Sequence, residues 1–180
     1  WVGVPWLGTA SDLMQVLDRH PRAWFVVDTI RLPVYYRGDW LAVLHTQMQL
    51  AWSGDEALAY VTRSTRQPLL TEPTVRLNRA FDRGVVLSGY SLPDQVVWRA
   101  GDVLPLILYW MTSQPLPTDY TVFVHLRDAQ AVTLAQRDSR PLDGIYPTSR
   151  WRPAESVIDP QPVKLPDHLL PGDYALWVGL

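Results

Sequence analysis

The second part of the chain, residues 71–180, consists of short apolar runs separated by Gly, Pro and Asp about every ten residues. This spacing is typical of an all-β domain in which two sheets pack against each other. Each run is a candidate strand, and the expected strands begin near Val75, Val85, Val96, Val103, Tyr120, Ala131, Ser156 and Tyr174. We therefore expect residues 71–180 to form an antiparallel β-sandwich, either immunoglobulin-like or jelly-roll-like.

One of these runs also predicts which side of its strand points inward. Successive residues of a strand point to opposite sides of the sheet. Between Tyr120 and Arg127, one alternating set is the more apolar, and it is the predicted core face: Tyr120, Val122, Val124 and Leu126.

Residues 1–70 mix helical and strand patterns. Thr9 or Ser11 can cap a first helix, and Pro21 prevents that helix from continuing. Residues 23–27 are continuously apolar, the pattern of a strand covered on both faces in a parallel sheet.

A second helix is expected between Asp39, its N-cap, and Gly54, which can supply a left-handed C-terminal residue. Its apolar stripe at helical spacing is Leu41, Leu44, Met48 and Trp52. Residues 57–62 are expected to form a further strand, and a first strand is expected near residues 2–6. This order predicts a small parallel α/β unit. The polar segment 64–73, with two prolines, reads as a linker, and we place the boundary near residue 70. The chain is thus expected to be α+β overall.

Charge and composition exclude several functions. Sixteen Lys plus Arg against eighteen Asp plus Glu give a net charge of −2, so the chain lacks the basic surplus that nucleic acid requires. Cysteine is absent, the four histidines show no His-x-x-x-His pair, and no Gly-rich phosphate loop occurs. We expect no nucleic-acid partner, metal, cofactor or catalytic residue. The longest apolar stretch, residues 103–111, is too short for a membrane helix.

One loop, residues 137–151, has the composition of a recognition site. It combines aromatic rings, carboxylates and arginines, which can stack on a sugar ring and hydrogen-bond its hydroxyls. The candidate ligand-binding residues are Asp138, Tyr146, Arg150 and Trp151. A structural interpretation fits equally well, in which a Tyr or Trp folds back over the edge of the sandwich and Arg–Asp pairs fix the loop.

Several motifs together resemble a recurring C-terminal domain of bacterial membrane enzymes. They are Gly101-Asp102-Val103, Leu108-Tyr109-Trp110, Asp119–Leu126, Ala135–Ser139, Tyr146–Trp151 and Leu170–Tyr174. This domain follows the multi-helix membrane portion of some glycosyltransferases similar to protein mannosyltransferases and aminoarabinose transferases. Residues 22–28 look like the α/β unit that often lies between the two.

The resemblance implies a parent enzyme that takes a sugar from a polyprenyl-phosphate donor at the outer membrane face. Its acidic catalytic loops would lie between membrane helices, so none can be assigned to this chain. We expect a non-catalytic, extracytoplasmic module, periplasmic or extracellular, truncated at its C-terminus. Its partners would be the missing membrane portion of the same chain and a glycan or acceptor.

A different class remains open: a structural or protein-interaction β-sandwich of an exported protein, without carbohydrate affinity. The two interpretations differ in where the aromatic rings lie. A sugar platform needs an exposed ring beside polar groups. A structural module would instead bury its large aromatic residues, Trp98, Trp110, Tyr146 and Trp151.

Overall fold

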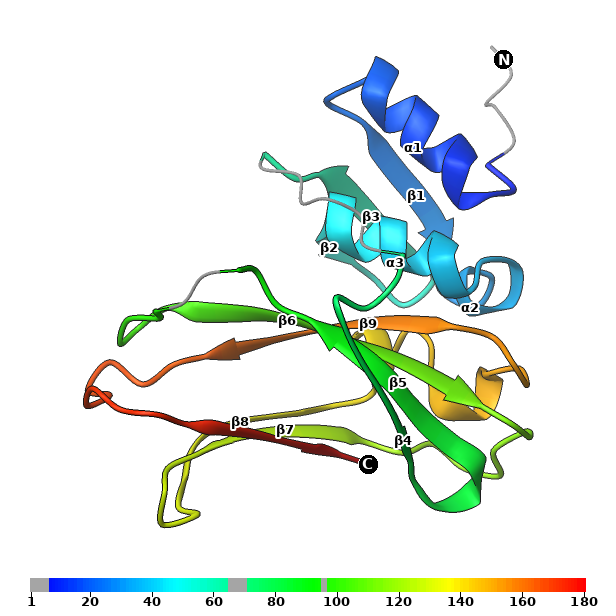
Figure 1. The fold of residues 1–180 in the computed structure, drawn as a ribbon. Helices are drawn as coiled ribbons and strands as arrows, with labels where there is room; N and C mark the ends of the chain where they lie inside the picture. The colour runs from blue at the N-terminus through cyan, green and yellow to red at the C-terminus, as the bar shows by residue number, and fades with distance from the viewer. Residues whose placement is uncertain (1–6, 65–70, 95–96) are drawn as a thin grey trace, which may run out of the picture. The chain divides into compact units, whose positions relative to one another are not determined.

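Figure 1 shows the computed structural model, which describes residues 7–64, 71–94 and 97–180. The chain divides into two units, Trp1–Thr71 and Glu72–Leu180. Strands account for 40% of the chain and helices for 20%, so the fold is a β-rich α+β fold. Every pair of neighbouring strands in the described residues is antiparallel.

The first unit combines helices with a three-stranded sheet of order β1-β3-β2. Its elements are α1 (Ala10–Arg19), β1 (Trp24–Asp28), α2 (Leu32–Tyr35), α3 (Gly38–Gln47), β2 (Met48–Ser53) and β3 (Ala57–Thr62). One face of the sheet packs through Phe25, whose ring lies 5.2 Å from that of Trp40 and 5.8 Å from that of Tyr36.

Helix α1 begins with a reciprocal cap at Thr9. The Asp12 backbone N–H donates to the Thr9 hydroxyl (3.1 Å), and the Thr9 backbone N–H donates to the Asp12 carboxylate (2.9 Å). Two donors that the helix itself cannot satisfy are thereby paired. Of the two capping residues that the sequence allowed, Thr9 is the one used.

Replacing Thr9 with alanine is expected to lower the free energy of unfolding of the first unit by about 1 kcal/mol, because an N-cap acceptor is lost. Ser11→Ala is the matched control. The Ser11 hydroxyl only accepts a long contact from Gln15 (3.5 Å). Chemical denaturation followed by circular dichroism measures both, and equal losses would show that the cap does not hold the helix.

The predicted parallel sheet of the first unit is wrong for the strands described. β1 pairs with β3 antiparallel, from Trp24↔Val61 to Asp28↔Ala57. β2 and β3 form a hairpin, closed where the Gly54 N–H donates to the Ala57 carbonyl (2.9 Å). In addition, β1 is not covered on both faces, because its Trp24 side chain is 66% exposed. The strand expected near residues 2–6 lies outside the described residues.

The second predicted helix is too long at its C-terminal end. α3 begins after Arg37, rather than at an Asp39 cap, and it ends at Gln47. The chain then continues as β2, and Gly54 lies in the hairpin turn instead of ending a helix.

The second unit consists of two antiparallel sheets, with orders β4-β5-β6-β9 and β10-β7-β8. The strands are β4 (Val75–Ala80), β5 (Val85–Ser91), β6 (Val103–Thr112), β7 (Val122–Arg127), β8 (Thr133–Ser139), β9 (Val157–Lys164) and β10 (Ala175–Gly179). Three short 3-10 turns are η1 (Asp82–Gly84), η2 (Pro141–Gly144) and η3 (Thr148–Arg150). The strand expected near Val96 falls partly outside the described residues, and residues 97–99 are not in a strand.

The two sheets lie face to face, with β8 packed against β9 (Figure 1). The predicted core face of β7 is confirmed for Val122, Val124 and Leu126, which are all buried. Tyr120 precedes the strand and is half-buried. From the opposite sheet, β6 contributes one alternating set of buried side chains: Leu104, Leu106, Leu108 and Trp110.

The outer edge of β9 lacks two of the usual backbone donors. Pro162 lies opposite Pro105 of β6, and two prolines cannot exchange N–H···O bonds. The backbone groups of Pro162 therefore point away from β6. Those of Pro160, two residues earlier, point the same way. Because both are proline, no N–H is available at either position along this edge.

None of the described helices has the length and apolar character needed to cross a bilayer.

Candidate functional site

The predicted recognition loop carries its two large aromatic rings inward. Tyr146 is fully buried and Trp151 is 3% exposed. The Trp151 indole N–H donates to the Tyr146 carbonyl (3.2 Å), and the Tyr146 hydroxyl contacts the Glu155 carboxylate (2.8 Å). The Trp151 ring also lies 6.4 Å from that of Trp110. Neither Tyr146 nor Trp151 therefore offers a ring face to a sugar.

The same loop is tied to the segment before β7. The Thr148 hydroxyl donates to the Thr118 carbonyl (3.0 Å) and accepts from the Tyr120 backbone N–H (2.8 Å). Hydrogen bonds from Ser149 lower the pKa of Asp119 below its ordinary value. These contacts tie the loop to the segment that precedes β7.

The four predicted residues do not form one exposed surface. Asp138 lies on β8, where its carboxylate contacts His125 (3.2 Å) and Gln136 (3.4 Å). The Arg150 side chain is exposed, while Tyr146 and Trp151 are buried. Loop composition alone does not reveal which side chains fold back onto the core.

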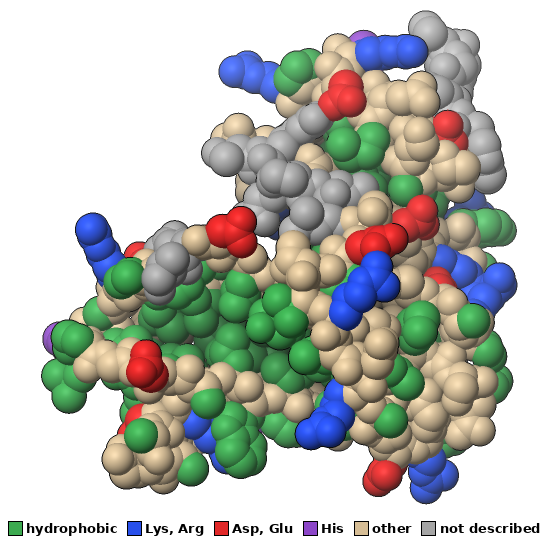
Figure 2. Space-filling model, viewed as in Figure 1, with side chains coloured by type: hydrophobic (Ala, Val, Ile, Leu, Met, Phe, Trp, Pro, Cys, Tyr) green, Lys and Arg blue, Asp and Glu red, His purple; other side chains and the backbone are tan. Residues whose placement is uncertain are grey.

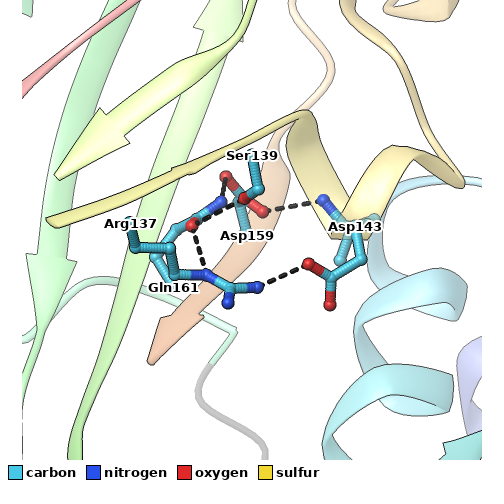
Figure 3. Close-up of polar contacts among 6 residues, drawn as sticks. Arg137, Ser139, Asp143, Asp159 and Gln161 are labelled. Atoms are coloured by element: carbon cyan, nitrogen blue, oxygen red, sulfur yellow. Dashed lines mark hydrogen bonds and ion pairs between the residues drawn. The ribbon is translucent and has the colours of Figure 1, made fainter. Parts of the chain in front are cut away.

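A buried polar cluster joins β8, β9 and η2 (Figure 3). The Asp159 carboxylate accepts from the Leu142 backbone N–H (2.8 Å) and from the Gln161 amide (2.9 Å). The Gln161 carbonyl in turn accepts from Arg137 Nε (2.9 Å) and from the Ser139 hydroxyl (3.0 Å).

Arg137 then connects this cluster to the surface. Its guanidinium also donates to Asp143 of η2 (2.5 Å). One chain of bonds thus runs from a solvent-exposed carboxylate to a fully buried one.

Asp159 is a structural group rather than a reactive one. It is fully buried, and burial raises its pKa to about 6 against the opposing hydrogen bonds from Leu142 and Gln161. Gln161 is fully buried as well, so no substrate reaches the carboxylate. The cluster fixes the facing sheets in register, because every polar group in it requires a particular partner.

The outer face of the β10-β7-β8 sheet gathers an exposed aromatic ring and polar side chains. Trp177 of β10 is 50% exposed, and the Arg127 guanidinium carbon lies 4.2 Å from the centre of its ring. Trp177 pairs across the sheet with His125, which in turn pairs with Gln136 of β8. The contact between His125 and Asp138 completes a row across all three strands. We call this set the outer-face array: Trp177, Arg127, His125, Gln136 and Asp138.

Two side-chain nitrogen atoms of this array make no hydrogen bond within the described residues. In the described part of the chain, His125 Nδ1 and Arg127 Nε have no hydrogen-bond partner. Buried polar atoms in proteins normally find partners, so exceptions call for an explanation such as a ligand or water.

Searches against protein families, curated proteins and solved structures returned no match.

Of the outer-face array, the sequence singled out only Asp138. The alternation in residues 120–127 already placed His125 and Arg127 on the face away from the core. The link to Trp177 and Gln136 depends on strand register, and the sequence does not specify register between distant strands. Within the residues described, no group of three or more His, Asp or Glu side chains could hold a metal ion. The arrangement suits recognition of a ligand through stacking and hydrogen bonding.

Proposed function

We propose that this chain is a non-catalytic extracytoplasmic module of a membrane-bound glycosyltransferase that uses a polyprenyl-phosphate sugar. In this proposal the outer-face array positions the glycan or the acceptor. The facing sheets of the second unit would form a β-sandwich of immunoglobulin-like or jelly-roll-like type. The sequence motifs support the enzyme context through their resemblance, and the exposed Trp177 beside polar groups supports the site.

The array has the ingredients of a carbohydrate platform. A sugar presents apolar C–H faces and a rim of hydroxyls, which suit an aromatic ring beside donors and acceptors. Trp177 supplies the ring, Arg127 supplies donors, and the Asp138 carboxylate, whose side chain is 42% exposed, supplies acceptors.

Trp177→Ala is expected to weaken glycan binding by about tenfold or more, because a central aromatic anchor is lost. The measurement is a glycan-array screen of the purified chain, followed by titration of the strongest glycan. Trp24→Ala is the matched control, since Trp24 is similarly exposed but belongs to the first unit.

If a glycan binds and its affinity survives Trp177→Ala, the array is not the site. If no glycan binds at all, the alternative of a structural or protein-interaction domain is preferred. That alternative expects four buried aromatic residues. Trp110, Tyr146 and Trp151 are buried, which favours it, whereas Trp98 is half-buried.

A further inference from the structure

The outer-face array carries one positive charge that no acidic side chain of the described residues neutralises. The guanidinium carbon of Arg127 lies 4.2 Å from the centre of the Trp177 ring. Among the residues that the structure describes, this guanidinium forms no hydrogen bond and no ion pair. A guanidinium stacked on a ring keeps its N–H donors in its own plane, so its edge remains able to bind a planar acceptor.

The carboxylate of the array already has partners of its own. Asp138 contacts His125 (3.2 Å) and Gln136 (3.4 Å). It lies opposite Phe123 on β7, and Arg127 follows four residues later on the same strand. Strand geometry therefore separates Asp138 and Arg127 by about 13 Å along β7. The array has its cation at one end and its carboxylate at the other.

Asp128, the acid next to Arg127 in the sequence, does not supply the missing partner either. Its carboxylate accepts from the backbone N–H groups of Gln130 (3.0 Å) and Val132 (2.8 Å). These bonds direct Asp128 into the turn between β7 and β8.

The surface around Trp177 leaves room for a sugar ring. The outward residues on either side of it in β10 are small, Ala175 and Gly179. A β-carbon at Gly179 would lie only 2.5 Å from the Phe123 ring, so Phe123 occupies the space of the missing side chain. The Phe123 ring lies 4.9 Å from that of His125. Trp177, which is 50% exposed, thus stands beside a low surface on β10.

The array is separate from the apolar hollow between the two sheets. Figure 2 shows hydrophobic side chains gathered in that hollow, whose walls include Leu87, Leu106 and Leu176. Leu176 and Trp177 are neighbours in β10, so their side chains point to opposite sides of the sheet. The unneutralised charge of Arg127 therefore belongs to the outer face.

We propose that the outer-face array selects an acidic sugar, one that carries a carboxylate as a uronic acid does. The edge of Arg127 would bind the carboxylate through two parallel hydrogen bonds. The Trp177 ring would stack on the sugar ring, and Gln136 and Asp138 would contact hydroxyls further along the array. This inference rests on the proposed function, since it names the class of glycan or acceptor that the same site would take.

A carboxylate matches the charge of the array better than a phosphate does. A phosphate monoester carries about −1.5 to −2 charges near neutral pH. The array offers one arginine and no second permanent cation, because His125 is already in contact with Asp138. One positive charge is balanced by one carboxylate.

The test uses the whole chain and three linear glucose-based trisaccharides. One has carboxylates at C6, the second has the methyl esters of these carboxylates, and the third has phosphates at O6. NMR titration, followed at the Trp177 indole N–H, gives the affinity for each and reports on the site itself. The carboxylate form is expected to bind about tenfold or more tightly than its ester, because a hydrogen bond to a charged group is lost in the ester. Added salt should weaken only the charged forms.

Two substitutions at Arg127 locate the charge that makes the difference. Arg127→Gln should bind the acid and the ester equally, whereas Arg127→Lys should retain part of the preference through its charge. Arg152→Gln is the matched control, since Arg152 is an exposed arginine outside the array, and it should leave the preference unchanged. The comparison of acid with ester in the wild type needs no variant, so it stands even if Arg127→Gln fails to fold.

The outcomes separate this inference from the proposed function. Equal binding of ester and acid, tighter binding of the phosphate form, or a preference that survives Arg127→Gln would each overturn the inference and leave a glycan site in place. Failure of the acidic trisaccharide to bind would also overturn it. The proposed function falls with it only if the glycan array finds no ligand of any kind.

Discussion

Trp151→Ala is expected to lower the free energy of unfolding of the second unit by about 3–5 kcal/mol, because it removes a large buried side chain and leaves a cavity. Trp151 is 3% exposed, contacts the Trp110 ring, and holds the loop through its bond to the Tyr146 carbonyl. Denaturant unfolding followed by circular dichroism measures the change.

Trp177→Ala is the control for Trp151→Ala, because it also removes a tryptophan, but one that is half-exposed. Its half-exposed ring contributes to stability mainly through Arg127, and such exposed contacts are worth about 1 kcal/mol or less. A small loss for Trp151→Ala, comparable with that for Trp177→Ala, would mean that the loop is not anchored by its aromatic rings.

The stability of the second unit is expected to fall as the pH rises through about 6, because of Asp159. Burial raises the pKa of this carboxyl from 3.8 to about 6. Between these values the folded state binds a proton that the unfolded state does not, so folding is favoured at low pH and disfavoured as pH rises. This difference between the two pKa values corresponds to a loss of about 3 kcal/mol in the free energy of unfolding over the same pH range.

The measurement compares denaturation midpoints of the wild type and Asp159→Asn between about pH 4 and about pH 7. The asparagine does not titrate, so the difference between the two curves should change with pH in the stated direction. Asp143→Asn is the control, because this carboxylate also belongs to the cluster but its side chain is 60% exposed. Parallel curves for wild type and Asp159→Asn would show that the buried carboxyl does not titrate in this range.

Much of the second unit could be predicted from its sequence. Strands near Val75, Val85, Val103 and Tyr174 follow from apolar runs between turn residues, and the structure has strands there. The inward face of β7 follows from simple alternation, because one side of the sheet is buried and the other is not. These are local signals, and no long-range pairing is needed to read them.

The first unit shows where local signals become ambiguous. Leu44, Met48 and Trp52 are spaced by four residues, which fits a helical stripe but is also a multiple of the strand period. The backbone turns from α3 into β2 at Met48, and the pairing of β2 with β3 decides the outcome. Gly54 was consistent with a helix end, but it serves the hairpin that makes the sheet antiparallel.

The candidate site depended on information that a single sequence lacks. Residues 137–151 contain the right side chains for sugar recognition, yet Tyr146 and Trp151 are used for packing. The Arg137–Asp143 pair, in contrast, agrees with the structural interpretation of the loop. Asp138 joins His125 only through the register of β7 and β8.

The two ends of the facing sheets should also differ in how they assemble with other chains. At one end, β9 lacks N–H donors at Pro160 and Pro162, and β8 directs Arg137 inward. Both features discourage a neighbouring strand from adding there. Two copies of the chain should therefore not join through this end, and growth of a sheet by strand addition is blocked there.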